Sequence, residues 1–179
     1  MSRIGKKPVP LPQGVKVKMA DGRLTVTGPH GTLSQLMPPR INIDIGTKEI
    51  NLVPQDESRL TRSYWGLART LAANMVTGVG AGFTQVLELV GTGYKVEAKG
   101  SSLVFNVGYS NPVDFPLPKG ISATVEKATR IELKGHDKEL LGQTVAVIRA
   151  LRPPDAYKGK GIKYAGEIIR RKVGKAGGR

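Results

Sequence analysis

The first half of the chain alternates apolar and polar residues and then changes period. Valines at positions 15 and 17 alternate with lysines, and Asp21-Gly22 predicts a tight hairpin turn into a strand with Leu24 and Val26. A second alternation covers positions 41 to 45. Gly46-Thr47 then predicts another turn, into a strand over positions 50 to 53. This part of the chain therefore reads as short antiparallel strands.

From position 60 the apolar spacing becomes that of an amphipathic helix. Asp56 or Ser58 is available as its N-cap, and Gly78 is the expected stop. The helix leads into Gly78–Gly82, which we interpret as a linker. The residues expected on its buried face are Leu60, Tyr64, Leu67, Ala68, Leu71 and Met75.

The same order of element types returns at an offset of roughly 80 residues, which favours a duplicated domain. In the second copy the helix is expected to start at Asp137 and to end before Pro153-Pro154. The fold class predicted is α+β, a tandem duplication of a small domain, each copy with antiparallel β-sheets and one α-helix around a single core. The predicted parts are residues 1–82, 83–152 and a basic, glycine-rich segment 153–179.

Positive charge is concentrated in the last 28 residues, which carry nine Lys/Arg and two acidic residues. The net charge of these 28 residues is therefore half of the chain's net charge of +14. Residues 83–151, by contrast, carry eight basic and seven acidic side chains. Such clustering indicates a directed contact with a polyanion, and a polyphosphate backbone is the obvious candidate. The alternatives are general solubility and a solvated, disordered tail.

The C-terminal segment also holds glycines and tyrosines among its cations. Glycines allow the backbone to approach phosphates, and Tyr157 and Tyr164 can either stack on unpaired bases or pack inside the domain. Because Ile162, Ile168 and their apolar neighbours do not suit a solvated tail, part of the segment should pack back on the second copy. We expect a short strand around Gly161–Tyr164.

Other chemistries find little support in the sequence. The chain has no cysteine, and His30 and His136 lie in turn-like contexts without carboxylates at ligand spacing, so no metal site is expected. Gly91-Thr92-Gly93 is interpreted as a hairpin turn. With no nucleophile motif or phosphate loop, we expect no enzyme, no cofactor and no small-molecule substrate. Without a membrane span or a secretory signal, the expected location is cytoplasmic.

A resemblance to a known family adds to this reading. Pro154-Asp155-Ala156-Tyr157-Lys158-Gly159-Lys160-Gly161-Ile162 resembles the signature of the L6 family of large-subunit ribosomal proteins, in its bacterial form. Ser2 to Pro8, Val90 to Lys95 and Val107 to Val113 resemble other parts of that family, so the similarity covers essentially the whole chain. It implies a duplicated fold with a structural rather than catalytic role.

The resemblance also implies a partner and a place. Members of the family bind 23S rRNA near the stalk base and the sarcin–ricin loop, among neighbouring ribosomal proteins and close to the docking site of translation GTPases. An RNA-processing enzyme and a free-standing nucleic-acid-binding regulator are the rival functions. The expected RNA-binding residues are Tyr157, Lys158, Gly159, Lys160, Gly161, Lys163, Arg170, Arg171, Lys172 and Lys175, with Arg3, Lys6 and Lys7 as secondary candidates.

Overall fold

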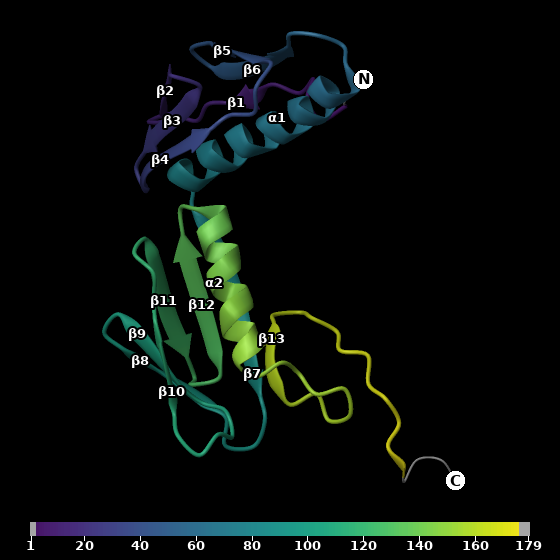
Figure 1. Cartoon of the computed structure of the whole chain (residues 1–179). Coiled ribbons are helices and arrows are strands. Elements are labelled where there is room, and N and C mark those ends of the chain that lie inside the picture. Colours follow the sequence, from purple (N-terminus) through teal and green to yellow (C-terminus); the bar gives the residue numbers. More distant parts are fainter. Residues whose placement is uncertain (1–2, 176–179) are drawn as a thin grey trace. The chain divides into compact units, whose positions relative to one another are not determined.

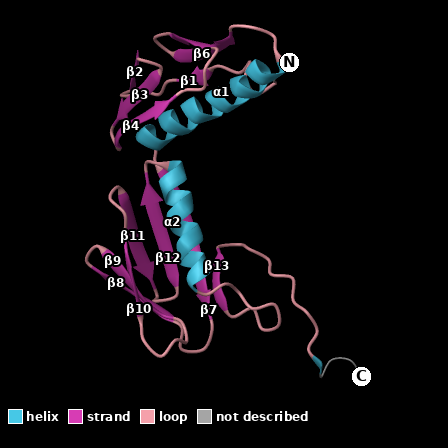
Figure 2. Ribbon diagram, viewed as in Figure 1, coloured by secondary structure: helices cyan, strands magenta, loops and turns pink. Residues whose placement is uncertain are grey.

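The structure is a computed structural model that describes residues 3–175, in two compact units (Figures 1 and 2). The first unit runs to Phe83 and includes His136–Lys138. The second contains Thr84–Gly135 and the chain from Glu139 onward.

The first unit contains two antiparallel three-stranded sheets and one long helix, α1 (Arg59–Gly80). One sheet has the strand order β1-β6-β5 and the other β2-β3-β4. In chain order the strands are β1 (Val9–Pro10), β2 (Lys16–Ala20), β3 (Arg23–Gly28), β4 (Gly31–Leu36), β5 (Ile41–Ile45) and β6 (Glu49–Pro54).

The turns of the first unit are those the sequence predicts. Asp21 and Gly22 both have positive φ, 50° and 72°, as a two-residue turn between β2 and β3 requires. Between β5 and β6, the Gly46 N–H donates to the Glu49 carbonyl at 2.9 Å. Both predicted hairpins are therefore confirmed.

Helix α1 begins as expected but ends later. The Ser58 hydroxyl accepts a hydrogen bond from the Thr61 N–H at 3.2 Å, so Ser58 is the N-cap. The helix continues through Gly78 to Gly80, because the Val79 side chain is fully buried and its carbonyl accepts the His30 N–H at 3.0 Å. The prediction that Gly78 stops the helix and that Gly78–Gly82 is a linker is therefore wrong; Ala81 is the C-cap.

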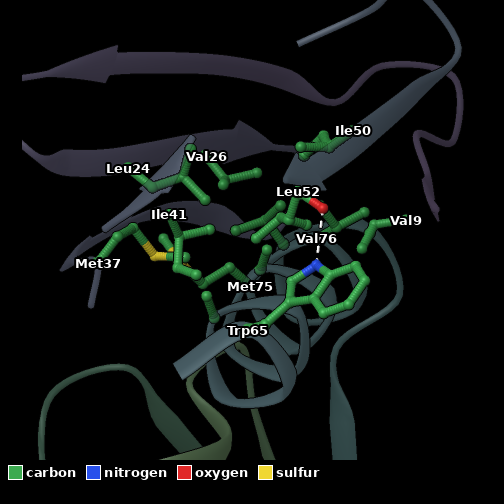
Figure 3. Packing of buried hydrophobic residues seen from close by; sticks show 13 residues of the cluster. Val9, Leu24, Val26, Met37, Ile41, Ile50, Leu52, Trp65, Met75 and Val76 are labelled. Atoms are coloured by element: carbon green, nitrogen blue, oxygen red, sulfur yellow. Dashed lines mark hydrogen bonds between the residues drawn. The ribbon is translucent and has the colours of Figure 1, made fainter. Parts of the chain in front are cut away.

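The buried face of α1 also differs from the expected one. Ala68 and Met75 are buried as expected, but Leu60 and Leu67 are each 49% exposed. Trp65 and Ala72, which were not expected on this face, lie in the core. The two alanines allow the helix to lie close to the strands, and Trp65 and Met75 fill the space on either side of them in the core. The core of the unit surrounds this face (Figure 3), and the Trp65 indole N–H donates to the Leu52 carbonyl at 2.7 Å.

The second unit repeats this plan with one extra strand. One sheet has the order β10-β9-β8 and the other β11-β12-β7-β13, with helix α2 (Lys138–Leu151) as the unit's helix. In chain order the strands are β7 (Phe83–Val90), β8 (Lys95–Lys99), β9 (Ser102–Asn106), β10 (Val113–Pro116), β11 (Ile121–Glu126), β12 (Arg130–Gly135) and β13 (Gly161–Tyr164).

The order of strands confirms the duplication. The sheet β1-β6-β5 corresponds to β7-β12-β11, and β2-β3-β4 corresponds to β8-β9-β10. In both copies six strands come first in the chain and one helix follows them: β1 to β6 precede α1, and β7 to β12 precede α2. Strand β13 has no counterpart among the described residues of the first unit, and it comes from the basic C-terminal segment.

One turn of the second unit was predicted wrongly. Gly91-Thr92-Gly93 lies between β7 and β8, but these strands belong to different sheets, so the segment is a connection between sheets and not a hairpin turn. The sequence showed two strands flanking glycines, which is the local pattern of a hairpin. Sheet membership depends on the long-range pairing of β7 with β12 and β13, which local pattern does not contain.

Replacing Trp65 tests the core of the first unit. Trp65→Phe should lower the free energy of unfolding by roughly 1–3 kcal/mol, because the buried Leu52 carbonyl loses its donor. Urea unfolding followed by circular dichroism measures the change. Leu67→Ala on the same helix is the control and should change stability by no more than about 0.5 kcal/mol, because the side chain is half exposed. Equal losses in the two variants would contradict this account of the core.

Candidate nucleic-acid interface

After helix α2 the chain forms a closed loop, residues 155–160, that we call the basic turn. The Asp155 N–H donates to the Lys160 carbonyl at 2.9 Å, and the Gly159 N–H donates to the Asp155 carbonyl at 2.9 Å. The Lys158 N–H donates to the Asp155 carboxylate at 2.8 Å. These hydrogen bonds join backbone groups of the turn to other atoms of the same turn. The side chains of Tyr157, Lys158 and Lys160 are exposed.

The carboxyl group of Asp155 is part of the turn. The Lys158 N–H, followed by those of Tyr157 and Ala156, lowers the pKa of Asp155 below its ordinary value. The side chain is therefore ionised at neutral pH and engaged with the backbone, and it fixes the shape of the turn.

Strand β13 attaches the segment to the second unit. Residues 161–164 pair antiparallel with β7, Ile162 is fully buried, and its N–H donates to the Arg152 carbonyl at 2.7 Å. The predicted short strand around Gly161–Tyr164 is confirmed. Tyr164 is half-buried with the Arg149 guanidinium 5.6 Å from its ring centre, whereas Tyr157 is 57% exposed.

A two-contact ion pair holds the chain after β13. The Arg149 guanidinium on α2 donates to both carboxylate oxygens of Glu167, at 2.6 and 3.2 Å, and the Tyr164 N–H donates to the same carboxylate at 2.9 Å. The hydrogen bonds from Arg149 are the main reason that the pKa of Glu167 is lowered. Glu167 thereby fastens the end of β13 to the helix.

The chain beyond Glu167 returns to the basic turn. The Lys172 N–H donates to the Ala156 carbonyl at 2.8 Å, and the Arg171 guanidinium lies over Gly159, where an added Cβ would be 3.3 Å away. Residues 168–175, which we call the tail, and the basic turn therefore lie side by side. Their cations are brought together although they are separated in the sequence by β13.

The predicted RNA-binding cations fall into two groups. Six are exposed and have no acidic side chain within 4 Å in the part of the chain that the structure describes: Lys158, Lys160, Arg170, Arg171, Lys172 and Lys175. Lys163 differs, because its ammonium lies 3.3 Å from the Glu88 carboxylate across β13 and β7 and its side chain is 24% exposed. The six exposed cations present positive charge to a partner without first breaking an ion pair.

Gly161 has a structural reason to be glycine. Its φ is 148°, and an added Cβ would lie 2.6 Å from the Pro154 Cα and 2.7 Å from the Pro153 carbonyl oxygen. The glycine thus allows β13 to pass close to the chain that leaves α2. Its expected role in RNA binding is untested, and the packing alone accounts for the residue.

The secondary candidates belong to the other unit. Arg3, Lys6 and Lys7 are exposed on the N-terminal arm of the first unit. Arg69 on α1 fixes this arm by donating to the carbonyls of Lys7 and Pro8 at 3.2 and 3.4 Å. The structure assigns these three cations to a different unit from the basic turn and the tail.

Sequence reasoning did not assign two tyrosines that lie close to the basic turn. Tyr94 and Tyr109 line a hollow of about 630 Å³ together with Arg152 and Lys160. Each follows a glycine with positive φ, Gly93 and Gly108, a Gly-Tyr pattern that recurs in the second copy. That recurrence is the sequence signal that could have drawn attention to them.

The family model described as ribosomal protein L6 matches residues 11–82 and 90–165. The chain belongs to the ribosomal protein L6 family. The two matches correspond to the two copies, and the second includes the basic turn and β13.

Full-length relatives agree with this assignment. The chain is 54% identical over 177 residues to a protein of Desulfatibacillum aliphaticivorans, with 99% of each chain covered. It is 50% identical to one of Microcystis aeruginosa, covering 99% of this chain and 94% of the relative, and 51% identical to one of Synechocystis sp., with 99% of each covered. Each relative is named large ribosomal subunit protein uL6.

Membership of the L6 family confirms the expectation of a structural protein that is not an enzyme. Within residues 3–175, no group of three or more potential metal-ligating side chains is present. No helix in the same range is long and apolar enough to cross a membrane.

The attachment of the tail to the second unit can be tested through pH. Because the folded-state pKa of Glu167 is lowered, its stabilisation is present at pH values above the ordinary 4.5 and is lost as the pH falls through the folded value. Glu167→Gln should therefore cost roughly 1–2 kcal/mol at neutral pH, and the difference from the unsubstituted protein should shrink in acid. Urea unfolding at about pH 7 and about pH 3 measures both differences.

The control for this test is Glu126→Gln, which removes an exposed ion pair with Arg130. It should change the free energy of unfolding by less than about 0.5 kcal/mol at either pH. A difference between Glu167→Gln and the unsubstituted protein that persists unchanged in acid would argue against the role assigned to the ion pair.

The close packing at Gly161 gives a second test. Gly161→Ala should destabilise the second unit by roughly 2–4 kcal/mol, because the added methyl group meets backbone atoms on a strained φ. Gly166→Ala is the matched control, since Gly166 also has positive φ but no atom lies within 4 Å of an added Cβ; its cost should be about 1 kcal/mol. Thermal unfolding measures both, and equal effects would show that packing is not decisive.

Proposed function

We propose that this chain is a structural constituent of the large ribosomal subunit in the cytoplasm, where it binds 23S rRNA through the basic turn and the tail. The observation that carries the proposal is the group of six exposed cations, with no ion pair to an acidic side chain in the described residues, on two segments that the Lys172–Ala156 backbone hydrogen bond joins. The relatives named large ribosomal subunit protein uL6 support the ribosomal setting.

The interface suits a phosphate backbone. Lysine and arginine side chains displace condensed counterions from RNA, which supplies affinity without reading sequence. Here the backbone under the cations is already closed by hydrogen bonds, so binding orders side chains more than main chain. Phosphate contacts of this kind fix position and orientation, whereas specificity has to come from RNA shape and unpaired bases.

Tyr157 is the residue in the basic turn that suits an unpaired base. Its side chain is 57% exposed, and it precedes Lys158, whose N–H is bonded to the Asp155 carboxylate. Stacking of one base on an aromatic ring contributes roughly 1–3 kcal/mol. Lys163 and the glycines Gly159 and Gly161 would then shape and support the surface, with Lys163 contributing charge only in competition with Glu88.

The finer setting rests on the family resemblance. We propose that the bound rRNA lies near the stalk base and the sarcin–ricin loop, close to neighbouring ribosomal proteins and to the docking site of translation GTPases. Arg3, Lys6 and Lys7 would provide a second, weaker RNA contact from the first unit, on the arm that Arg69 fixes.

The proposal predicts that removing three of the free cations releases the protein from RNA. The triple variant Lys158→Gln, Lys160→Gln, Lys172→Gln should bind a 23S rRNA transcript roughly tenfold to a hundredfold more weakly. Its slope of log affinity against log salt should fall by about 2–3, because up to three phosphate contacts are lost. In a sucrose gradient the unsubstituted protein should sediment with large subunits, and the variant should dissociate at lower salt.

A matched variant separates site from net charge. Lys16→Gln, Lys18→Gln, Lys48→Gln removes the same charge from exposed positions of the first unit and should leave affinity and salt slope nearly unchanged. Equal losses in both triple variants would show nonspecific attraction. An unsubstituted protein that stays at the top of the gradient would favour a free-standing regulator or an RNA-processing enzyme over a ribosomal constituent.

A further inference from the structure

The hollow beside the C-terminal end of α2 combines aromatic rings with positive charge. It measures about 630 Å³, which lies within the range of small-molecule sites. The residues that matter for its chemistry are Tyr94, Tyr109, Arg152, Pro154, Asp155 and Lys160. All of them belong to the second unit, and the hollow borders the basic turn.

Tyr109 presents one ring in a fixed orientation. Its hydroxyl donates to the Leu151 carbonyl at the end of α2, at 2.8 Å, and yet the side chain is 50% exposed. The guanidinium carbon of Arg152 lies 5.2 Å from the ring centre, within the range of a cation–π contact. The ring is therefore held at its hydroxyl end while much of its surface is open to solvent.

Tyr94 is held from two sides by glycines. An added Cβ would lie 2.8 Å from the Tyr94 ring at Gly91 and 3.2 Å from its hydroxyl oxygen at Gly108. Both glycines have positive φ, 156° and 82°, so the backbone approaches the ring as only glycine readily permits. The connection between β7 and β8, which does not form a hairpin, thus serves to place this ring.

The charge of the hollow is positive on balance. Hydrogen bonding to Tyr109, and then to Tyr94, raises the pKa of Arg152, whose guanidinium stays protonated. Lys160 has no ion pair among the described residues. Asp155 is the acidic lining residue, and its carboxylate already accepts the Lys158 N–H. A planar, uncharged group flanked by an anion fits these surroundings.

We propose that this hollow binds one unpaired nucleotide of the RNA, with its base stacked on Tyr109 and its phosphate on Arg152 and Lys160. The proposal rests on the proposed function and adds a base contact to it. Unpaired bases are commonly recognised by stacking on aromatic side chains and on the planes of arginine guanidinium groups. The rings and the cation are already positioned, so little ordering of the protein is needed for binding.

Tyr109 also has a structural contact, so the test separates the ring from the hydroxyl. Tyr109→Leu removes the stacking surface and should weaken binding of a 23S rRNA transcript roughly 5- to 150-fold, the fold-change for one stacked base. Its salt slope should not change, because no phosphate contact is lost. Tyr109→Phe keeps the ring and should bind within about threefold of the unsubstituted protein, while Arg152→Gln should lower the slope by about one.

The outcomes distinguish this inference from the proposed function. If the triple lysine variant loses binding but Tyr109→Leu binds normally, the base contact is wrong and the proposed function stands. If the triple lysine variant binds normally, the proposed function itself fails. Equal losses for Tyr109→Phe and Tyr109→Leu would assign the effect to the Leu151 contact and overturn the inference, as would saturable binding of AMP at micromolar concentrations, which would indicate a free nucleotide.

A measurement on the unsubstituted protein guards against misfolded variants. Tyr109 is half exposed and should be nitrated by tetranitromethane in the free protein. In the complex with 23S rRNA the stacked base should protect it, which peptide mass spectrometry can measure. Unchanged nitration of Tyr109 in the complex would overturn the inference.

Discussion

The pairing of β13 with β7 is the interaction on which the candidate interface depends. It fixes Gly161–Tyr164 in the sheet, with Ile162 fully buried, and so anchors the chain between the basic turn, which precedes the strand, and the tail, which follows it. The Arg149–Glu167 ion pair then directs the chain back, so that Lys172 bonds to Ala156. Without this strand, a segment so rich in charge and glycine has too little apolar surface to order itself. A four-residue strand thereby converts a charged tail into a defined surface.

The two copies treat the same sheet edge in different ways. In the second unit the edge of β7 is extended by β13, whereas the corresponding edge strand of the first unit, β1, pairs with β6 alone among the described strands. The Leu11 N–H donates to the carbonyl of Lys48, just before β6. Because successive residues of an extended strand point their backbone nitrogens to opposite sides, the nitrogens of Pro10 and Pro12 face the open edge. Proline has no N–H, and that edge cannot accept a further strand in regular pairing. The two copies have thus kept the same topology, while proline closes the edge in the first unit and β13, which leads into the candidate interface, extends it in the second.

Local pattern was sufficient for most of the fold. Alternating residues, the Asp21-Gly22 turn, the Ser58 cap and the prolines after α2 act within a few residues, so their consequences can be read from the sequence. The predictions were wrong where contacts between distant parts of the chain determine the structure. Helix α1 extends past Gly78 because Val79 packs in the core, and β7 and β8 do not pair because they belong to different sheets. The same holds for the site. The cations of the basic turn could be found as a cluster, but the Lys163–Glu88 pair and the meeting of Tyr109 with Arg152 join segments that lie far apart in the chain.

The concentration of cations in the basic turn and the tail destabilises the folded segment in the free protein. Arg171 lies over Gly159, and Lys172 is bonded to the backbone of the same turn that carries Lys158 and Lys160, so cations of the two segments are gathered in one region without ion pairs to acidic side chains in the described chain. Their mutual repulsion opposes the closed arrangement, and the buried Ile162, the ion pair of Glu167 and the β13 ladder stabilise it. A polyanion relieves this repulsion when it binds. The folding of the segment and any affinity for phosphate are therefore linked: interactions that hold the tail in place also maintain the concentrated charge that a polyanion would neutralise.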